Sequence, residues 1–302
     1  MSTPWRERPE RGGRRITRFY IWLCLKVGRR MARPILYGIA LYFFVSAPRE
    51  RRVSADYLRR VGVRPASPFQ VYRHIFTFST VIMDRLFFLA RRREDITVAL
   101  HGVEAFDALR AENKGFLLAS AHFGSFEALR VLGISEHSHP VKTLMYLENA
   151  EQLNELLADV NPDVTESVIP LGRPESILEV KEWLGKGGIV GILADRITQG
   201  DKMTRVDFLG APAEFPLGPW LLSAMLKAPV ILCLAVYRGS GHYDIHFEPL
   251  TDGTDADRAR RQETAERLAA LYADRLAHYC RKAPYNWFNF YDFWSDGRNS
   301  KT

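Results

Sequence analysis

The chain has 302 residues, of which 47% are hydrophobic and 25% charged, a composition typical of a globular protein and not of a disordered one. Three cysteines, Cys24, Cys233 and Cys280, lie far apart and form no CxxC pair, which argues against a disulfide framework and a cysteine-ligated zinc site and fits a reducing compartment. The net charge of +7 is uneven, since residues 1–60 carry 15 basic and 4 acidic residues whereas residues 61–302 carry 27 and 31. The basic character therefore belongs to the N-terminal part.

The N-terminal part changes character at residue 16. Residues 1–15 are rich in Arg, Gly and Pro and predict a flexible basic tail. Residues 16–94 alternate apolar clusters with cations, and the uncharged run 34–48 is shorter than the roughly 20 residues that a spanning helix needs. We expect a helical region that associates with a membrane as an interfacial or re-entrant anchor.

The cations that flank this run, among them Arg29, Arg30 and Arg33, match the anionic lipids on the cytoplasmic face of an inner membrane. Nucleic-acid binding would use these arginines but would leave the large apolar side chains unexplained, so no nucleic-acid partner is expected. An alternative stays open, in which the helices of this region pack on the core of the protein itself.

The rest of the chain, residues 95–302, alternates short apolar runs with helical patterns. This alternation predicts an α/β domain whose central, mostly parallel sheet is flanked by helices. The expected strands are residues 96–100, 116–121, 141–146, 189–194, 230–236 and 243–247. The expected helices are residues 65–91, 103–111, 126–132, 150–160, 174–185, 217–227 and 255–281.

Ionisable residues follow the end of the strand expected at 116–121. His122 comes directly after it, Gly124 permits a tight turn, Ser125 is a good N-cap, and Glu127 falls in the first turn of the next helix. A carboxylate beside an imidazole fixes its tautomer and raises its basicity, as a general base for a hydroxyl group requires. The alternative is a core histidine followed by an acid that the helix dipole favours.

A second strand end, at 189–194, is followed by Asp195 and Arg196, with Lys202 and Arg205 shortly after. A carboxylate at this edge of the sheet can orient a polar group of a substrate, and the cations can hold a phosphate. Taken alone, Asp195 is equally explained as a turn-forming residue.

Several features follow one another in a specific order: His122-x4-Glu127, the strand that ends at Asp195, residues 206–213, the helix at 218–227, and Ala228-Pro229-Val230. This order resembles the bacterial lipid A biosynthesis acyltransferases (lauroyl/myristoyl type) of the lysophospholipid acyltransferase superfamily, over about residues 16–294. The resemblance implies a glycerolipid acyltransferase-like fold. It also implies transfer of a fatty acyl group from an acyl carrier protein or CoA thioester to a hydroxyl of a membrane lipid or glycolipid.

Carried over by position, the resemblance makes His122 the catalytic base and Glu127 its partner. It makes a second set of residues substrate-binding: Asp195, Arg196, Arg173, Lys202, Arg205 and Ser125. No metal or cofactor is expected, because a thioester is already activated and backbone N–H groups can stabilise the oxyanion. The turn at 123–125 and the segment 215–218 are the candidates for these N–H groups.

The chain departs from the resembled family after the strand at 141–146. The lipid A enzymes generally carry arginines there, including a Tyr-Arg-Pro, whereas this chain has Met145-Tyr146-Leu147-Glu148-Asn149. The loss of these cations argues against a phosphorylated disaccharide as acceptor and indicates a divergent member.

Two other functions account for part of this pattern. A serine-type lipid hydrolase would use Ser120, which shares a strand face with His122, but the chain has no G-x-S-x-G elbow. A non-catalytic membrane-binding protein would explain the N-terminal part but not the placement of His122, Glu127 and Asp195. The aromatic segment at 285–294 predicts core packing or closure over the sheet.

Overall fold

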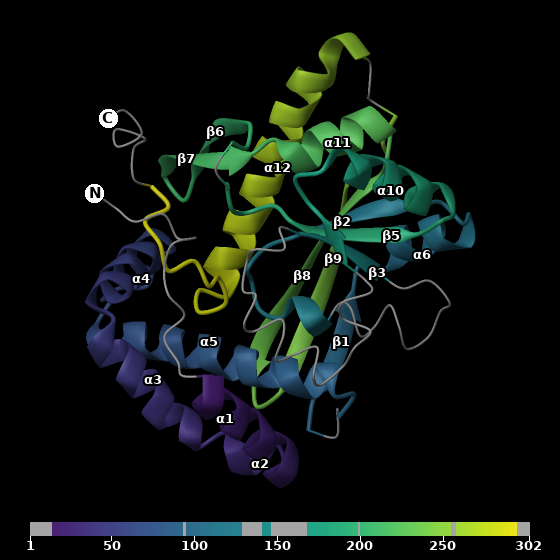
Figure 1. The fold of residues 1–302 in the computed structure, drawn as a ribbon. Coiled ribbons are helices and arrows are strands. Elements are labelled where there is room, and N and C mark those ends of the chain that lie inside the picture. Colours follow the sequence, from purple (N-terminus) through teal and green to yellow (C-terminus); the bar gives the residue numbers. More distant parts are fainter. Residues whose placement is uncertain are drawn as a thin grey trace.

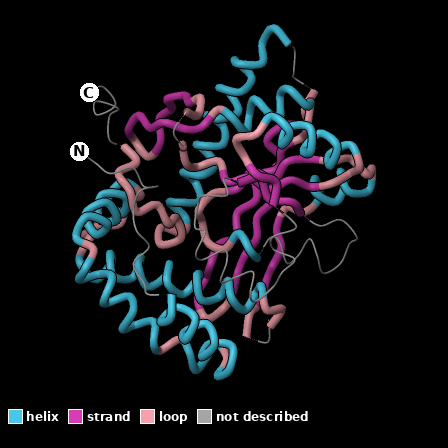
Figure 2. The backbone as a smooth tube through the Cα atoms, viewed as in Figure 1, coloured by secondary structure: helices cyan, strands magenta, loops and turns pink. Residues whose placement is uncertain are grey.

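A central sheet with helices on both of its faces forms the body of the computed structural model (Figures 1 and 2). Its seven strands are ordered β1-β9-β8-β2-β5-β3-β4, and a separate hairpin joins β6 to β7. The structure describes residues 14–92, 95–128, 141–145, 168–198, 200–254 and 258–294. The α/β class expected from the sequence is confirmed.

The strands that carry the predicted site residues are neighbours. The sheet contains β1 (Thr97–His101), β2 (Phe116–Ser120), β3 (Val141–Met145), β4 (Val168–Pro170), β5 (Ile189–Leu193), β8 (Val230–Gly239) and β9 (His242–Thr251). Strands β2, β3, β4, β5 and β8 are parallel, whereas β9 runs antiparallel to β8 and parallel to β1. Ser120 pairs with Leu193, so β2 and β5 end side by side and deliver the residues that follow them to the same edge.

The helices divide into an N-terminal group and a group that belongs to the α/β part. The first group is α1 (Arg14–Val27), α2 (Arg29–Ala32), α3 (Ile35–Ser46), α4 (Pro48–Arg60) and α5 (Pro68–Leu89). The second is α6 (Glu104–Ala111), α10 (Pro174–Gly185), α11 (Gly218–Leu226) and α12 (Arg261–Lys282), the last preceded by the 3-10 turn η2 (Arg258–Arg260). The helix expected at 150–160 lies outside the described residues, as do residues 129–132 and residues 1–13 of the basic tail expected at 1–15, whose last two residues belong to α1.

The hairpin was not expected from the sequence. It pairs β6 (Met203–Phe208) with β7 (Ala211–Pro216) in antiparallel register. The two strands contain Arg205, Asp207, Pro212 and Glu214, so they lack the continuous apolar run that identifies the buried strands of the main sheet.

Alternation along β2 places its side chains in two separate cores. Leu117 and Ala119 belong to a cluster that includes Leu268 and Tyr272 of α12. Phe116 and Leu118 belong to another that includes residues of α5. All five residues of β2 are buried, which explains why the sequence shows an uninterrupted apolar run there.

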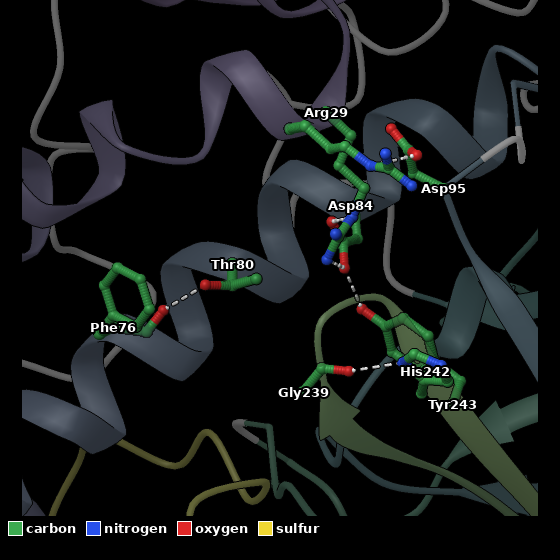
Figure 3. A network of polar contacts seen from close by, with 9 residues as sticks. Arg29, Phe76, Thr80, Asp84, Asp95, Gly239, His242 and Tyr243 are labelled. Carbon is green, nitrogen blue, oxygen red and sulfur yellow. Dashed lines mark hydrogen bonds and ion pairs between the residues drawn. The ribbon is translucent and has the colours of Figure 1, made fainter.

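The N-terminal helices are packed against the domain through a buried ion pair (Figure 3). The Arg29 guanidinium donates to both carboxylate oxygens of Asp84 on α5, at 2.7 and 2.9 Å, and the Tyr243 hydroxyl of β9 donates to the same carboxylate at 2.8 Å. The expectation that Arg29 is a surface cation that meets anionic lipids is therefore wrong. Its charge neutralises a buried carboxylate that would be costly alone.

Side chains of α1, α2 and α3 also enter the core, among them Ile21, Cys24, Leu36 and Ala40. The alternative expectation, that these helices pack on the core of the protein itself, is therefore correct for the face of the helices that carries these side chains. Within the described residues no single helix is long and apolar enough to cross a membrane. A pair of segments, Arg29–Ser46 and Pro48–Arg60, meets the criteria jointly across a 98° bend.

Candidate active site

A histidine and an aspartate meet where β2 and β5 end. The Nδ1 atom of His122 lies 2.8 Å from Oδ1 of Asp195, and the backbone N–H of His122 donates to Oδ2 at 3.0 Å. The Asp195 side chain is fully buried, whereas 30% of the His122 side chain is exposed. The imidazole of the pair is therefore accessible to solvent, while the carboxylate that binds it is not.

The Asp195 carboxylate accepts a third hydrogen bond, from the Trp287 indole N–H at 2.9 Å. Burial alone raises the pKa of Asp195, but the contact with His122, the charge of Arg196 and the Trp287 bond together hold it below its ordinary value. The carboxylate is therefore ionised and can only accept. Its partner Nδ1 must carry the proton, which leaves Nε2 of the neutral imidazole as an acceptor.

The charge state of His122 suits it to take up a proton. Burial of the ring, followed by the positive charge of Arg196, lowers the pKa of His122, and Asp195 offsets part of this effect. The imidazole is consequently neutral at physiological pH. Within the described part of the chain Nε2 has no hydrogen-bond partner, and a neutral imidazole that carries an ionised carboxylate on Nδ1 has the arrangement of a general base.

Glu127 does not contact Nδ1 of His122, contrary to the expectation from the sequence. Its Oε1 lies 2.6 Å from Nε of Arg85 on α5, and both side chains are mostly buried. The reason is positional, since the helical turn that begins at Phe126 carries Glu127 to α5 while Asp195 already occupies Nδ1. The pair still acts on the site, because the Arg85 charge contributes to lowering the pKa of His122.

The aromatic segment near the C-terminus forms one wall of the site. The Phe288 N–H donates to the His122 carbonyl at 2.7 Å, and the Gly124 N–H donates to the Asn286 carbonyl at 2.8 Å. The Asn286 side chain forms two hydrogen bonds with the backbone of Tyr237 on β8. Its Oδ1 accepts from the Tyr237 N–H at 2.7 Å, and its Nδ2 donates to the Tyr237 carbonyl at 3.2 Å. Closure over the sheet was expected for this segment, but a bond from Trp287 to Asp195 was not.

A buried histidine outside the reacting pair supports the same wall. His74 of α5 contacts the Trp287 carbonyl through Nε2 at 2.9 Å and the Ser54 hydroxyl of α4 through Nδ1 at 2.8 Å. A carbonyl can only accept, so Nε2 carries the proton and Ser54 donates to Nδ1. Burial lowers the pKa of His74 to about 4, which keeps it neutral. His74 thereby connects the N-terminal helices to the segment that holds Asp195.

The turn after His122 requires glycine and offers fewer free amides than expected. Gly124 has φ +57°, and a Cβ there would lie 1.6 Å from the Ala235 carbonyl oxygen. The N–H groups of Gly124 and Ser125 donate to the carbonyls of Asn286 and Ala235. The expectation that these two amides stabilise an oxyanion is wrong, because both are already bonded.

The predicted substrate-binding residues occupy different surroundings. Arg196 donates to the Phe288 carbonyl at 3.0 Å, and Ser125 is buried in the turn. Arg205 lies on the hairpin in an exposed ion pair with Glu214, while Arg173 and Lys202 are exposed. In the described part of the chain, no contact joins the last three cations to the histidine and aspartate pair.

Ser120 is a poor nucleophile in this fold. It is the last residue of β2 and only 1% exposed, while its carbonyl accepts from the Tyr272 hydroxyl. A serine nucleophile needs an accessible hydroxyl, so the site does not favour a serine hydrolase.

Comparisons with known proteins identify the family. The sequence model of the family described as bacterial lipid A biosynthesis acyltransferase matches residues 9–295. Two Mycobacterium tuberculosis proteins named phosphatidylinositol mannoside acyltransferase, from strains H37Rv and CDC 1551, are 24% and 25% identical over 291 residues. Each alignment covers 90% of this chain and 86% of the relative. The chain belongs to the bacterial lipid A biosynthesis acyltransferase family and is a lipid acyltransferase.

Proposed function

We propose that this family member transfers a fatty acyl group from a CoA or acyl carrier protein thioester to a hydroxyl of a glycolipid at a membrane surface. The observation that carries the proposal is the pair of His122 and buried Asp195, in which Nδ1 is bonded and Nε2 has no hydrogen-bond partner among the described residues. A hydroxyl nucleophile needs a base of this kind, and a thioester supplies the leaving group.

In this mechanism, Nε2 of His122 takes the proton of the acceptor hydroxyl as its oxygen attacks the thioester carbonyl carbon. The tetrahedral intermediate collapses with cleavage of the C–S bond, and the imidazolium returns the proton to the leaving thiolate. The products are an ester and a free thiol. Asp195 stabilises the imidazolium that forms in between, because its ionised carboxylate already lies 2.8 Å from Nδ1. Neither step calls for a metal or cofactor.

The acceptor class follows from two arguments. The chain lacks the arginines that the lipid A enzymes carry after the strand at 141–146, which argues against a phosphorylated disaccharide. Its mycobacterial relatives are named for a mannosylated phosphoinositide. We therefore propose a sugar hydroxyl of a glycosylated phospholipid as the acceptor.

Mass spectrometry of membrane lipids from cells with and without the gene tests this acceptor. The expected result is loss of one glycolipid species and accumulation of a species lighter by one acyl group, restored by the wild-type gene but not by His122→Ala. An unchanged glycolipid profile, or an acyl change confined to non-glycosylated lipids, contradicts the proposed acceptor.

We further propose that the N-terminal helices bind the membrane with the face that they turn away from the core. The N-terminal apolar surface is defined by large side chains that are 41–71% exposed on α1, α2, α3 and the start of α5: Phe19, Trp22, Met31, Ile35, Tyr37, Leu41, Tyr42, Val45 and Phe69. Soluble proteins rarely expose so many large apolar groups on adjoining elements, so this surface supports a lipid partner. Lys26, which lies over the Trp22 ring, adds an exposed cation beside it for anionic headgroups, and Arg30 is exposed there in an ion pair with Asp95.

Vesicle co-sedimentation tests the membrane proposal with a matched control. The double variant Trp22→Gln with Leu41→Gln removes two exposed apolar side chains, and Leu178→Gln removes one from α10, outside the N-terminal apolar surface. Each fully buried side chain of this size is worth about 1.5–3 kcal/mol, so the double variant should bind vesicles at least about 10-fold more weakly. The control should bind like wild type, and equal binding of all three proteins contradicts the proposal.

A further inference from the structure

Two histidines and an aspartate converge on the far side of β8 from the catalytic pair. His101 ends β1 and His246 lies on β9, and the two are Cα partners in the parallel register of these strands. Asp244 precedes His246 by two residues and therefore lies on the same face of β9. The sheet itself thus sets the spacing of the three side chains.

The three groups lie together without hydrogen bonds between them. Their ligand atoms are all within 4.8 Å of one another, and the two imidazole rings are stacked with centroids 4.7 Å apart. Nε2 of His101 and Oδ1 of Asp244 are 3.7 Å apart, too far for a hydrogen bond. Arg238 donates to Oδ2 of Asp244 at 2.7 Å, which orients the carboxylate and leaves Oδ1 for another partner.

We propose that His101, Asp244 and His246 bind a divalent transition metal of the zinc type. Zinc takes imidazole nitrogen and carboxylate oxygen at about 2.0–2.2 Å, so its ligands lie about 3.3 Å apart in tetrahedral geometry. Side chains that are 48% (His101) and 26% (Asp244) exposed can close from 4.8 Å to that separation by rotation about their side-chain bonds. Three protein ligands leave the fourth position to water.

The ligand set distinguishes this metal from Mg²⁺ or Ca²⁺. Two imidazoles favour zinc, nickel or copper over the hard cations, which prefer oxygen. The Arg238 guanidinium neutralises much of the carboxylate charge, so the nitrogen donors dominate the affinity. Metal binding here does not supply the acyl-transfer reaction, because β8 separates β9 from β2 and its catalytic histidine.

The consequence of binding would be structural. Among the strands that the structure describes, β1 lies at the edge of the sheet and pairs only with β9. A metal held by His101 from β1 and by Asp244 and His246 from β9 would fasten the edge strand to the sheet. Because the metal binds only the folded arrangement, it would raise the melting temperature.

Titration of the full-length, chelator-treated protein with ZnCl₂ by isothermal calorimetry tests the site, with Co²⁺ absorption reporting the ligand geometry. We expect one Zn²⁺ per chain in wild type and more than about 100-fold weaker binding in His246→Ala, beyond the 10–100-fold typical of lost second-shell groups. The matched control is His242→Ala, on the same strand and face, whose Nδ1 contacts the Gly239 carbonyl instead (Figure 3). It should bind Zn²⁺ like wild type and keep the zinc-induced rise in melting temperature.

His101→Ala provides a second variant on the more exposed side chain, should His246→Ala fail to fold. Absence of Zn²⁺ binding to wild type overturns the proposal, as does wild-type affinity in a folded His101→Ala or His246→Ala protein. Equal weakening in His242→Ala also overturns it, because that would place the metal elsewhere. These measurements involve no acyl transfer, so they stand apart from any failure of the proposed function.

Discussion

The exchange of Asp195 for Asn tests whether this residue, and not Glu127, supports the base. In the native protein the carboxylate of Asp195 accepts from His122 Nδ1, from the His122 backbone N–H and from the Trp287 indole. An amide replaces one accepting oxygen with an NH₂ group, which must then face one of these three donors. Either a donor meets a donor, or the imidazole adopts the Nε2–H tautomer and loses its acceptor toward the substrate.

The magnitude follows from the role of the base. General-base catalysis contributes about 10²- to 10⁴-fold, so loss of the correct tautomer should lower kcat/KM by that factor, or about 3–5.5 kcal/mol of barrier. Glu127→Gln, by contrast, removes a charge that contacts Arg85 and should cost less than about 10-fold. The order of the two losses therefore identifies the partner of the imidazole.

Thiol release from an acyl thioester, followed as a function of pH, provides the assay. In wild type, kcat/KM should fall as the pH drops through the lowered pKa of His122, because only the neutral imidazole accepts a proton. Asp195 opposes that lowering, so its replacement should move the acidic limb to still lower pH. A folded Asp195→Asn enzyme with more than about a tenth of wild-type activity, or a larger loss in Glu127→Gln, would refute the reasoning.

Three further predictions concern the surroundings of the pair. Arg29→Met should lower the free energy of unfolding in urea by about 3–5 kcal/mol because it leaves Asp84 buried and unpaired, and adding Asp84→Asn should restore part of the loss. His74→Ala should reduce kcat more than His74→Gln, whose amide can still donate to the Trp287 carbonyl; equal kcat values would show that this bond does not position Asp195. Exhaustive chelation should leave thiol release unchanged below the melting transition, in wild type and in His246→Ala alike, and a loss in His246→Ala that one added metal reverses would contradict His122 as a free base.

Local pattern was sufficient for six of the seven described strands of the main sheet, and it missed the three-residue strand β4 (Val168–Pro170). β2 and β5 are almost entirely apolar because both of their faces are covered, and each is followed, after one alanine, by an ionisable residue where the chain leaves the core. The sequence could therefore place His122 and Asp195 at strand ends. It could not show that β2 and β5 are adjacent, because the strand order is fixed by packing among distant segments.

The error about Glu127 has the same origin. The sequence places Glu127 five residues from His122 and Asp195 73 residues away, so proximity along the chain favoured the wrong carboxylate. Trp287, a further 92 residues beyond Asp195, looked like core packing, since no local pattern shows where an indole N–H will find an acceptor. Which polar side chains meet at the edge of a sheet depends on the tertiary structure, even when each of them follows a strand that the sequence predicts.

The burial of Arg29 changes how the N-terminal cluster of cations is interpreted, and it also decides which experiment can test membrane binding. A carboxylate within a predicted apolar helix, Asp84 at 65–91, was the one sequence signal that a cation had to reach the core. Removal of residues 1–47 would take away Arg29 together with the N-terminal apolar surface, so loss of membrane binding would follow from an unfolded domain as readily as from a lost anchor. Point changes at Trp22 and Leu41 leave the ion pair in place, and only such changes separate binding to lipid from stability of the fold.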